Sequence, residues 1–332
     1  MIALLTPAEG AEVLLHRPIH TAFLAGEIVP DAAGTVDWLH LRQEGEDQSA
    51  PARVTFSFSP PCDGRVEVAA TADFASRRSF PAVAGQAQGG NFLPGTTYFW
   101  RVRTAREISV TGRFITSPAL PRMLAVEGIS NVRDCGGWPV YRAGRQVGRV
   151  RFDRIFRTSE FDRHVQITEA GRQELAALGI RTDLDIRGAG EDPRPVLDPT
   201  RVRYVNIPLS AYAEVFTPEQ RAAYRRTAEV LCERPYPLAV HCWGGIDRTG
   251  TWLFLLGALL GMAERDLFLD YEWSSLSLWG PRSHQSAQFQ AFLTELAAYG
   301  TDVNTAAERF FSACGVTAEE VAQIRGELTE PC

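Results

Sequence analysis

One stretch of the sequence, residues 240–251 (V-H-C-W-G-G-I-D-R-T-G-T), constrains the fold more than any other. An apolar segment precedes it at residues 235–240 and an apolar segment follows at residues 252–260, so we expect a strand, a turn and a helix in that order. Glycines in the turn let successive backbone N–H groups face one point, and the positive end of the following helix adds to their field. The turn is therefore predicted to bind an oxyanion.

Two side chains make this anion site a candidate reaction centre. Cys242 stands at the start of the turn, where aligned N–H dipoles favour a thiolate nucleophile. Arg248 carries a planar guanidinium that matches two phosphate oxygens. Five residues separate them, which lets the chain wrap once around a phosphate with the sulfur below phosphorus. The predicted phosphate-binding residues are Trp243, Gly244, Gly245, Ile246, Asp247 and Arg248.

Length and composition are those of a globular chain with two domains. The chain has 332 residues, of which 45% are apolar and 22% charged, and its net charge of -6 argues against a nucleic-acid partner. The six cysteines are scattered without a C-x-x-C pair, so neither a metal site nor a cofactor is expected. The N-terminus lacks the pattern of a signal peptide, and the longest apolar run, residues 252–262, is too short for a bilayer. We expect a cytoplasmic protein without a membrane span, secreted only if a leader has been removed.

Residues 1–117 have the pattern of an all-β domain. Residues 53–58 and 65–69 alternate between apolar and polar side chains, and helical periodicity is missing. The turn and aromatic strand at residues 92–102 resemble the tyrosine corner of fibronectin type III domains, in which the tyrosine hydroxyl, here that of Tyr98, bonds back to the turn. The resemblance implies an immunoglobulin- or fibronectin-like sandwich with Tyr98 and Trp100 as core anchors; a protein or glycan ligand of this domain is the alternative role. Residues 118–127 are expected to be a linker.

Residues 128–332 alternate between strand and helix patterns. Strands are expected at residues 154–157, 180–186, 203–208 and 235–240. Helices are expected at residues 168–178, 217–233, 252–260, 263–275, 286–298, 302–314 and 317–328, two of them opened by capping boxes at Thr217 and Thr317. This alternation predicts an α/β domain with a central, mostly parallel sheet flanked by helices. The turn at Cys242 then lies at the carboxyl end of a strand, where such sheets place their sites.

The turn, written H-C-x-x-G-x-D-R-T-G, resembles the catalytic loop of the cysteine-dependent protein tyrosine phosphatase superfamily. Three upstream blocks extend the resemblance: residues 131–137 (N-V-R-D-C-G-G), 154–159 (R-I-F-R-T-S), and 178–187 (L-G-I-R-T-D-L-D-I-R) with Glu191. They are similar to a branch of bacterial tyrosine and dual-specificity phosphatases that includes phosphoinositide-hydrolysing members. The resemblance implies a tyrosine-phosphatase-like fold for residues 128–332. It also implies a phosphomonoesterase that works through a phosphocysteine on a phosphorylated peptide or small phosphomonoester.

The same resemblance implies roles for side chains around Cys242. His241 is expected to fix the loop through a backbone hydrogen bond or to be a buried structural histidine. The hydroxyl of Thr249 is expected to stabilise the sulfur as a leaving group. A general acid must protonate the leaving oxygen, and two carboxyl groups qualify: Asp247 in the loop, which its position favours, and Asp185 at the end of a neighbouring strand. Alternatively, one of these carboxylates orients an arginine. The supporting arginines are Arg133, Arg157 and Arg187.

Three functions remain open from the sequence. The leading one is hydrolysis of phosphotyrosine-like monoesters, favoured by Ile246, where lipid-active members often carry lysine, and by the bulky Trp243. A phosphoinositide or inositol phosphate phosphatase would need further basic residues at the pocket, which the supporting arginines would supply. A catalytically dead phosphate-binding adaptor conflicts with the intact loop. Cys135 is expected to be either a small buried side chain or a thiol that forms a disulfide with Cys242.

Overall fold

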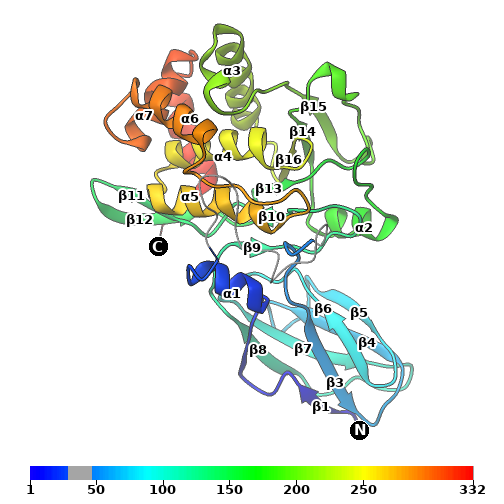
Figure 1. Ribbon diagram of the computed structural model, residues 1–332. Coiled ribbons are helices and arrows are strands. Elements are labelled where there is room, and N and C mark those ends of the chain that lie inside the picture. The colour runs from blue at the N-terminus through cyan, green and yellow to red at the C-terminus, as the bar shows by residue number, and fades with distance from the viewer. Residues whose placement is uncertain (29–46, 332) are drawn as a thin grey trace. The chain divides into compact units, whose positions relative to one another are not determined.

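The structure, a computed structural model, describes residues 1–28 and 47–331 and divides into two compact units (Figure 1). The first unit comprises residues 1–24 and 51–125, and the second comprises residues 25–50 and 126–332. The change of unit after residue 125 falls inside the segment 118–127 that the sequence suggests as a linker. The assignment of residues 25–50 to the second unit has no counterpart in the sequence pattern.

The first unit contains two sheets and one short helix. Its three-stranded sheet has the order β1 (Ala3–Thr6), β3 (Val54–Ser59), β6 (Gln86–Gly89). Its five-stranded sheet has the order β2 (Ala11–Val13), β8 (Gly112–Thr116), β7 (Thr97–Arg103), β4 (Gly64–Ala69), β5 (Arg78–Ala82). The helix α1 (Pro18–Leu24) was not expected, because two turns are too few to show a helical period in the sequence.

Alternating side chains of β7 build the core of the first unit. Tyr98, Trp100 and Val102 point inward and are buried, whereas the residues between them are more exposed. They pack in a cluster that includes Phe56 and Phe114. The hydroxyl of Tyr98 accepts a hydrogen bond of 2.9 Å from the backbone N–H of Leu93, the bond back to the turn that the aromatic pattern suggests.

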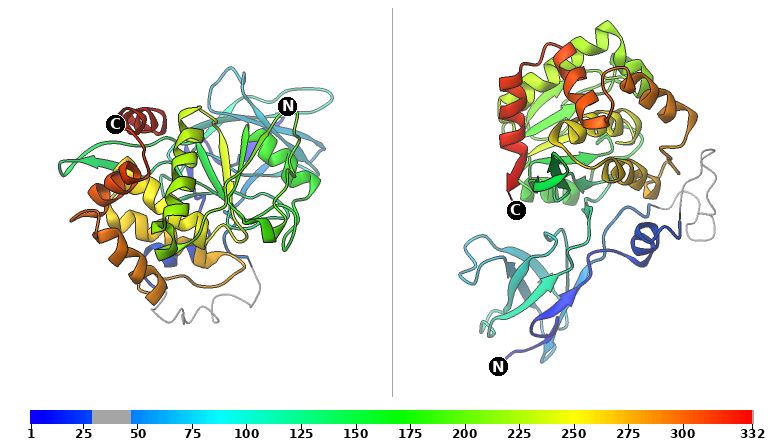
Figure 2. Two further views of the ribbon diagram at one scale, coloured as in Figure 1. Left: turned by 90° about the horizontal axis from the view of Figure 1, so that it is seen from above. Right: turned by 90° about the vertical axis from the view of Figure 1, so that its left-hand side faces the viewer.

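The second unit is built around a mixed sheet whose strands run side by side through its middle (Figure 2). The order within this unit is β15 (Arg203–Asn206), β14 (Thr182–Asp185), β16 (Leu238–His241), β13 (Ile155–Thr158) and β10 (Arg133–Asp134). The first four strands are parallel, and β10 is antiparallel to β13. A mostly parallel sheet is what the sequence predicts, whereas the position of β16 between β14 and β13 is seen only in the structure.

Helices flank this sheet and pack against one another around α4 (Asp247–Leu260). The others are α2 (Glu169–Ala177), α3 (Pro218–Cys232), α5 (Glu264–Trp273), α6 (Ala287–Ala297), α7 (Val303–Ala313) and α8 (Ala318–Leu328). Each lies within the range expected from the sequence, except that α4 begins at Asp247, before the expected residue 252. Thr317 completes a capping box, whereas Thr217 caps α3 without the reciprocal bond.

A small sheet, not expected from the sequence, adds β11 (Pro139–Arg142), β12 (Arg145–Val150) and β17 (Thr329–Pro331) to the second unit. In the part of the chain that the structure describes, every helix is too short or too polar to cross a bilayer.

Candidate active site

The candidate loop, residues 242–246, leaves the carboxyl end of the central strand β16. In the parallel register, His241 at the end of β16 pairs with Thr158 of β13 on one side and with Asp185 of β14 on the other. Three strands therefore end together beneath the loop, and α4 begins directly after it at Asp247. The helix thus points its positive end at the same place as the strand ends.

Close approaches explain both glycines of the loop. Gly245 has φ +65°, and a Cβ there would lie 2.0 Å from the carbonyl oxygen of Thr158. At Gly244 a Cβ would lie 3.0 Å from the indole ring of Trp279. The loop can thus rest against the end of β13 on one side and against an indole on the other only where side chains are absent.

Donors outside the loop hold its carbonyl groups. The amide of Asn131 donates to the carbonyl oxygens of Gly244 (3.2 Å) and Gly245 (3.0 Å), and Arg157 Nη2 donates to Gly245 at 2.6 Å. The N–H of Glu160 donates to the carbonyl of Trp243 at 2.8 Å. In a trans peptide the next N–H points the opposite way, so the following N–H groups face the inside of the loop. Among the described residues no acceptor takes the N–H groups of residues 243–246. This is the geometry of an anion nest.

Cys242 is buried at the base of this nest, with only 3% of its surface exposed. The preceding His241 contacts the carbonyl oxygen of Cys242 through Nδ1 (3.2 Å) and Asp183 Oδ1 through Nε2 (2.9 Å). Burial acts to lower the pKa of His241, but the carboxylate of Asp183 outweighs it and raises this pKa to about 9. His241 is thus both buried and bonded to the loop, and at neutral pH its imidazolium is paired with the carboxylate of Asp183.

Arg248 follows the loop in the first turn of α4, and Glu191 holds its guanidinium. Arg248 Nη2 lies 2.7 Å from Glu191 Oε1, and Nη1 binds the other carboxylate oxygen. The same carboxylate accepts the N–H of Gly188 at 3.0 Å, so it is itself fixed. Glu191 stands in one of the sequence blocks quoted above, but the sequence suggested no role for it. The two-point contact fixes the plane of the guanidinium next to the nest.

Arg133 and Arg157 lie behind the loop rather than in its mouth. Both are fully buried, and both bind the carboxylate of Asp270 in α5, at 3.1 Å from Arg133 Nε and 2.8 Å from Arg157 Nη1. Asp270 is a residue that the sequence did not single out. These arginines therefore brace the loop from below and offer no free charge to a ligand.

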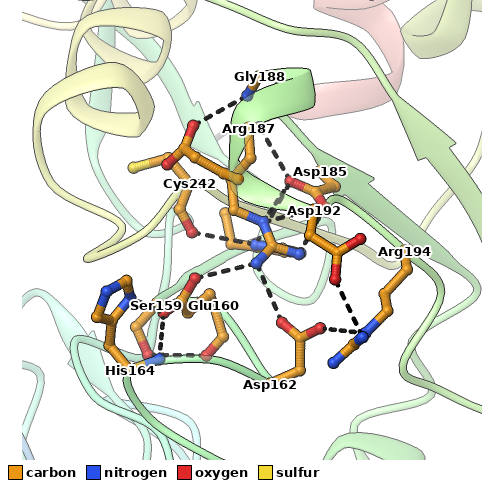
Figure 3. Close-up of polar contacts among 12 residues, drawn as sticks. Ser159, Glu160, Asp162, His164, Asp185, Arg187, Gly188, Asp192, Arg194 and Cys242 are labelled. Atoms are coloured by element: carbon orange, nitrogen blue, oxygen red, sulfur yellow. Dashed lines mark hydrogen bonds and ion pairs between the residues drawn. The ribbon is translucent and has the colours of Figure 1, made fainter.

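Arg187 is the centre of a cluster of carboxylates beside the loop (Figure 3). Its guanidinium binds Asp185 at 2.8 Å and both Glu160 and Asp162 at 3.0 Å. Asp185 also accepts the hydroxyl of Tyr204 at 2.9 Å and has no exposed surface. The geometry of Asp185 is that of a residue that orients an arginine.

Asp247 is the carboxylate at the open side of the loop, with 38% of its side chain exposed. Arg282 donates to Asp247 through Nε (2.8 Å) and Nη2 (3.3 Å), and the hydroxyl of Tyr212 donates to the same carboxylate. Burial acts to raise the pKa of Asp247, but Arg282 and then Tyr212 outweigh it and hold this pKa below its usual range. Sequence reasoning missed both partners, since each lies 35 residues away without a motif.

Trp243, the residue after Cys242, forms a stacked pair with His164. The two rings are 3.7 Å apart between centroids and nearly parallel, at 18°. His164 is held by Glu160, whose carboxylate lies 2.6 Å from Nδ1. The indole remains 41% exposed, so a flat apolar surface is fixed beside the loop.

Two further residues from the sequence have simple surroundings. The hydroxyl of Thr249 is buried in α4 and has no hydrogen-bond partner among the described residues. Cys135 and Cys242 are both free thiols. Burial raises the pKa of Cys135 well above its usual value, which opposes the thiolate that a disulfide exchange requires. Within residues 1–28 and 47–331, no cluster of three His, Cys, Asp or Glu side chains is arranged to hold a metal ion.

Comparisons with known proteins place the chain in a family. Residues 124–330 match the tyrosine phosphatase family. The chain belongs to that family. A protein of Cupriavidus necator named as a tyrosine-protein phosphatase, H16_A0669, is 28% identical over 204 residues, which cover 53% of this chain and 69% of that protein. The phosphatase is thus a cysteine-based enzyme.

Two solved structures are also similar to this phosphatase. The core catalytic domain of the PP-IP phosphatase Siw14 from S. cerevisiae, in complex with citrate, is 17% identical with a TM-score of 0.29, covering 43% of this chain and 86% of that one. A second structure of the Siw14 catalytic core is 18% identical with a TM-score of 0.30, covering 43% and 85%.

The charge on His241 predicts a loss of stability at alkaline pH. Its pKa is about 9, above the value of about 6.5 expected in the unfolded chain, so its contribution is complete below pH 6.5 and is lost as pH rises through 9. We expect the free energy of unfolding to fall by up to about 3 kcal/mol between pH 6.5 and pH 9.5. Urea unfolding at several pH values measures this, and His241→Gln should flatten the decline. An equally steep decline in the variant would contradict it.

Proposed function

We propose that this phosphatase hydrolyses aryl monophosphates of the phosphotyrosine type through a phosphocysteine intermediate. The observation that carries the proposal is the nest itself: its carbonyls are held from outside, its N–H groups are left for an anion, and Cys242 lies at its base. Arg248, oriented by Glu191, supplies the two-point contact for the equatorial oxygens of the phosphoryl group.

The reaction follows in two displacements. The Cys242 thiolate attacks phosphorus, the bond from phosphorus to the leaving oxygen breaks, and Asp247 gives its proton to that oxygen. Water then attacks the phosphocysteine, the Asp247 carboxylate takes a proton from it, and the S–P bond breaks to release phosphate. We propose that the hydroxyl of Thr249 donates a hydrogen bond to the departing sulfur. Among the described residues this hydroxyl has no other hydrogen-bond partner.

Asp247 is the proposed general acid because of where the two carboxylates lie. Asp247 is partly exposed at the open side of the loop, whereas Asp185 has no exposed surface and is engaged by Arg187 and Tyr204. A general acid must reach the leaving oxygen of a bound substrate, which a fully buried carboxylate cannot do without a rearrangement of its ion pair.

The charge balance of the site supports a monophosphate over a polyphosphate substrate. The five arginines that hold the loop, the Arg187 cluster or Asp247 each have a carboxylate partner, so they leave little uncompensated positive charge for additional phosphate groups. These arginines are Arg133, Arg157, Arg187, Arg248 and Arg282. Ile246 is buried and adds no charge, and the exposed indole of Trp243 offers a surface for an aromatic leaving group. An inositol phosphate or phosphoinositide is the alternative that the substrate test must exclude.

We further propose that the first unit is a fibronectin type III-like sandwich, supported by its two sheets, their shared aromatic core and the Tyr98 hydrogen bond. The D-R-T-G sequence of residues 247–250 supports placing the chain in the bacterial tyrosine and dual-specificity branch.

A phosphate-release assay tests the proposed substrate class. We expect kcat/KM for p-nitrophenyl phosphate and phosphotyrosine peptides to exceed that for inositol hexakisphosphate and phosphoinositides by about tenfold or more, because the site lacks spare positive charge. Cys242→Ser is the matched control and should lose roughly 10³-fold or more. Preference for the polyphosphates would overturn the substrate class, and turnover retained in the serine variant would overturn the covalent mechanism.

Leaving-group dependence identifies the general acid. Asp247→Asn should lower kcat for phenyl phosphate by roughly 10²-fold, because phenolate leaves poorly without a proton, while affecting p-nitrophenyl phosphate much less. Asp185→Asn breaks a buried ion pair, so we expect lower stability and similar losses on both substrates. If only the Asp185 variant lost activity selectively on phenyl phosphate, Asp185 would be the general acid and the proposed role of Asp247 would be wrong.

Arg282 sets the pH range of the proposed acid. Its positive charge favours the carboxylate of Asp247, so Arg282→Gln should raise the pKa of Asp247 and move the alkaline limb of kcat for phenyl phosphate, which reports the substrate complex, upward by about one pH unit. The control is Arg194→Gln, which removes an exposed arginine that pairs with Asp162 instead. Superimposable limbs for the wild type and Arg282→Gln would show that Asp247 does not govern that limb.

A further inference from the structure

The outer face of the five-stranded sheet in the first unit carries four arginines around one carboxylate. Arg101 and Arg103 alternate with the core residues of β7 and therefore point outward, as does Arg65 on β4. Arg77 lies just before β5. We call Arg65, Arg77, Arg101 and Arg103 the arginine face. It lies within one compact unit, on β4, on β7 and just before β5, three strands that lie side by side in Figure 1.

Glu67 is the shared partner of three of these arginines. Its side chain is nearly buried, and its two oxygens accept from Arg101 Nε (2.7 Å) and Arg103 Nε (2.8 Å), with Arg77 Nε at 3.3 Å. No other carboxylate among the described residues pairs with the arginine face. About three positive charges therefore stay uncompensated on a chain whose net charge is -6.

The sheet register makes this arrangement unfavourable for the fold. Arg65 lies directly opposite Arg103 on the neighbouring strand, and like charges in that position destabilise a sheet. Within residues 1–28 and 47–331, Arg65 has no carboxylate partner; its Nε donates to the hydroxyl of Ser79 at 2.7 Å. Arg65 thus holds on to the neighbouring strand β5 through Ser79, and its exposed positive charge stays available to a ligand.

The geometry of the guanidinium groups suits a ligand with carboxylates. Arg101 and Arg103 each use Nε for Glu67, which leaves their terminal nitrogens without a partner among the described residues. The guanidinium of Arg101 also lies 4.0 Å from the ring centroid of Phe74, which limits its motion. Arg103 is 42% and Arg77 47% exposed. Arg101, at 22% exposure, is the more covered and more firmly held fork, and Arg103 and Arg77 are accessible ones. Such forks bind carboxylate or phosphate groups at two points.

We propose that the arginine face binds an acidic, extended segment of a partner protein. Residues two apart on one strand, such as Arg101 and Arg103, are about 7 Å apart, which matches alternate side chains of an extended peptide. Glu67 is nearly buried and compensates one of the four charges, so about three remain, which suits a short acidic segment better than a nucleic-acid backbone with its about six to ten phosphate contacts. The net charge of the chain further disfavours a long polyanion. The proposal rests on the first unit alone and is independent of the proposed substrate.

The test uses the full chain and a fluorescein-labelled decapeptide of alternating glutamate and serine, followed by anisotropy at 50 mM salt. The double variant Arg65→Gln/Arg103→Gln should bind at least tenfold more weakly, while Arg145→Gln/Arg201→Gln, a matched loss of two exposed arginines in the second unit, should change affinity less than twofold. Removing the opposed charges should leave the melting temperature unchanged or raise it. Turnover of p-nitrophenyl phosphate should not change in either variant.

Several outcomes would overturn the proposal: no binding at 50 mM salt, equal weakening in both double variants, or tighter binding of a 20-nucleotide oligo-dT or of phosphatidylserine vesicles than of the peptide. If the double variant melts lower than the wild type, the single variant Arg65→Gln replaces it, because Arg65 has no carboxylate partner to lose. That variant should weaken peptide binding at least threefold, and an unchanged affinity would reject the arginine face as the binding site.

Discussion

The outward hold on the loop carbonyls is the interaction on which the rest of the site depends. A short loop would ordinarily turn some of its carbonyl oxygens toward its own interior, where they would repel an anion. Asn131 and Arg157 prevent this by binding the carbonyls of Gly244 and Gly245 from below. Because each N–H group points opposite to the carbonyl of its peptide unit, the N–H groups face the inside of the loop. The nest is therefore formed without a ligand.

This hold requires a buried charge, and the buried charge explains much of the surrounding structure. Arg157 has no exposed surface, so its guanidinium needs a carboxylate partner nearby. Asp270 supplies it and is shared with Arg133, which in turn contacts the side chain of Asn131. The donors of the loop are therefore linked through one ion-pair network. The network also explains why Arg133 and Arg157, which the sequence suggests as supporting residues of the phosphate site, hold the loop in place and do not face a ligand.

The sequence singled out the candidate nucleophile Cys242, the candidate phosphate ligand Arg248 and the order of strands and helices, because each of these is a local pattern. The apolar run before Cys242 and the glycines after it encode a strand and a turn without reference to the rest of the chain. Asp270, Arg282 and Tyr212 carry no such local signal, since they reach the loop only after α5 and distant loops have packed. Likewise, only the pairing of β4 with β7 brings Glu67 next to Arg101 and Arg103. What the sequence leaves out is the set of long-range charge partners.

These partners also couple the proposed acid to its substrate. Without a ligand, Arg282 and Tyr212 keep Asp247 as a carboxylate, a form that cannot donate a proton. A phosphate dianion that enters the nest adds negative charge beside that carboxylate and so favours its protonation. In this proposal Arg248 binds the phosphate dianion. Arg282 does not bind it, and instead limits how readily Asp247 is protonated. If Asp247 is the general acid, binding of the substrate therefore promotes the protonation of Asp247 that the first displacement requires.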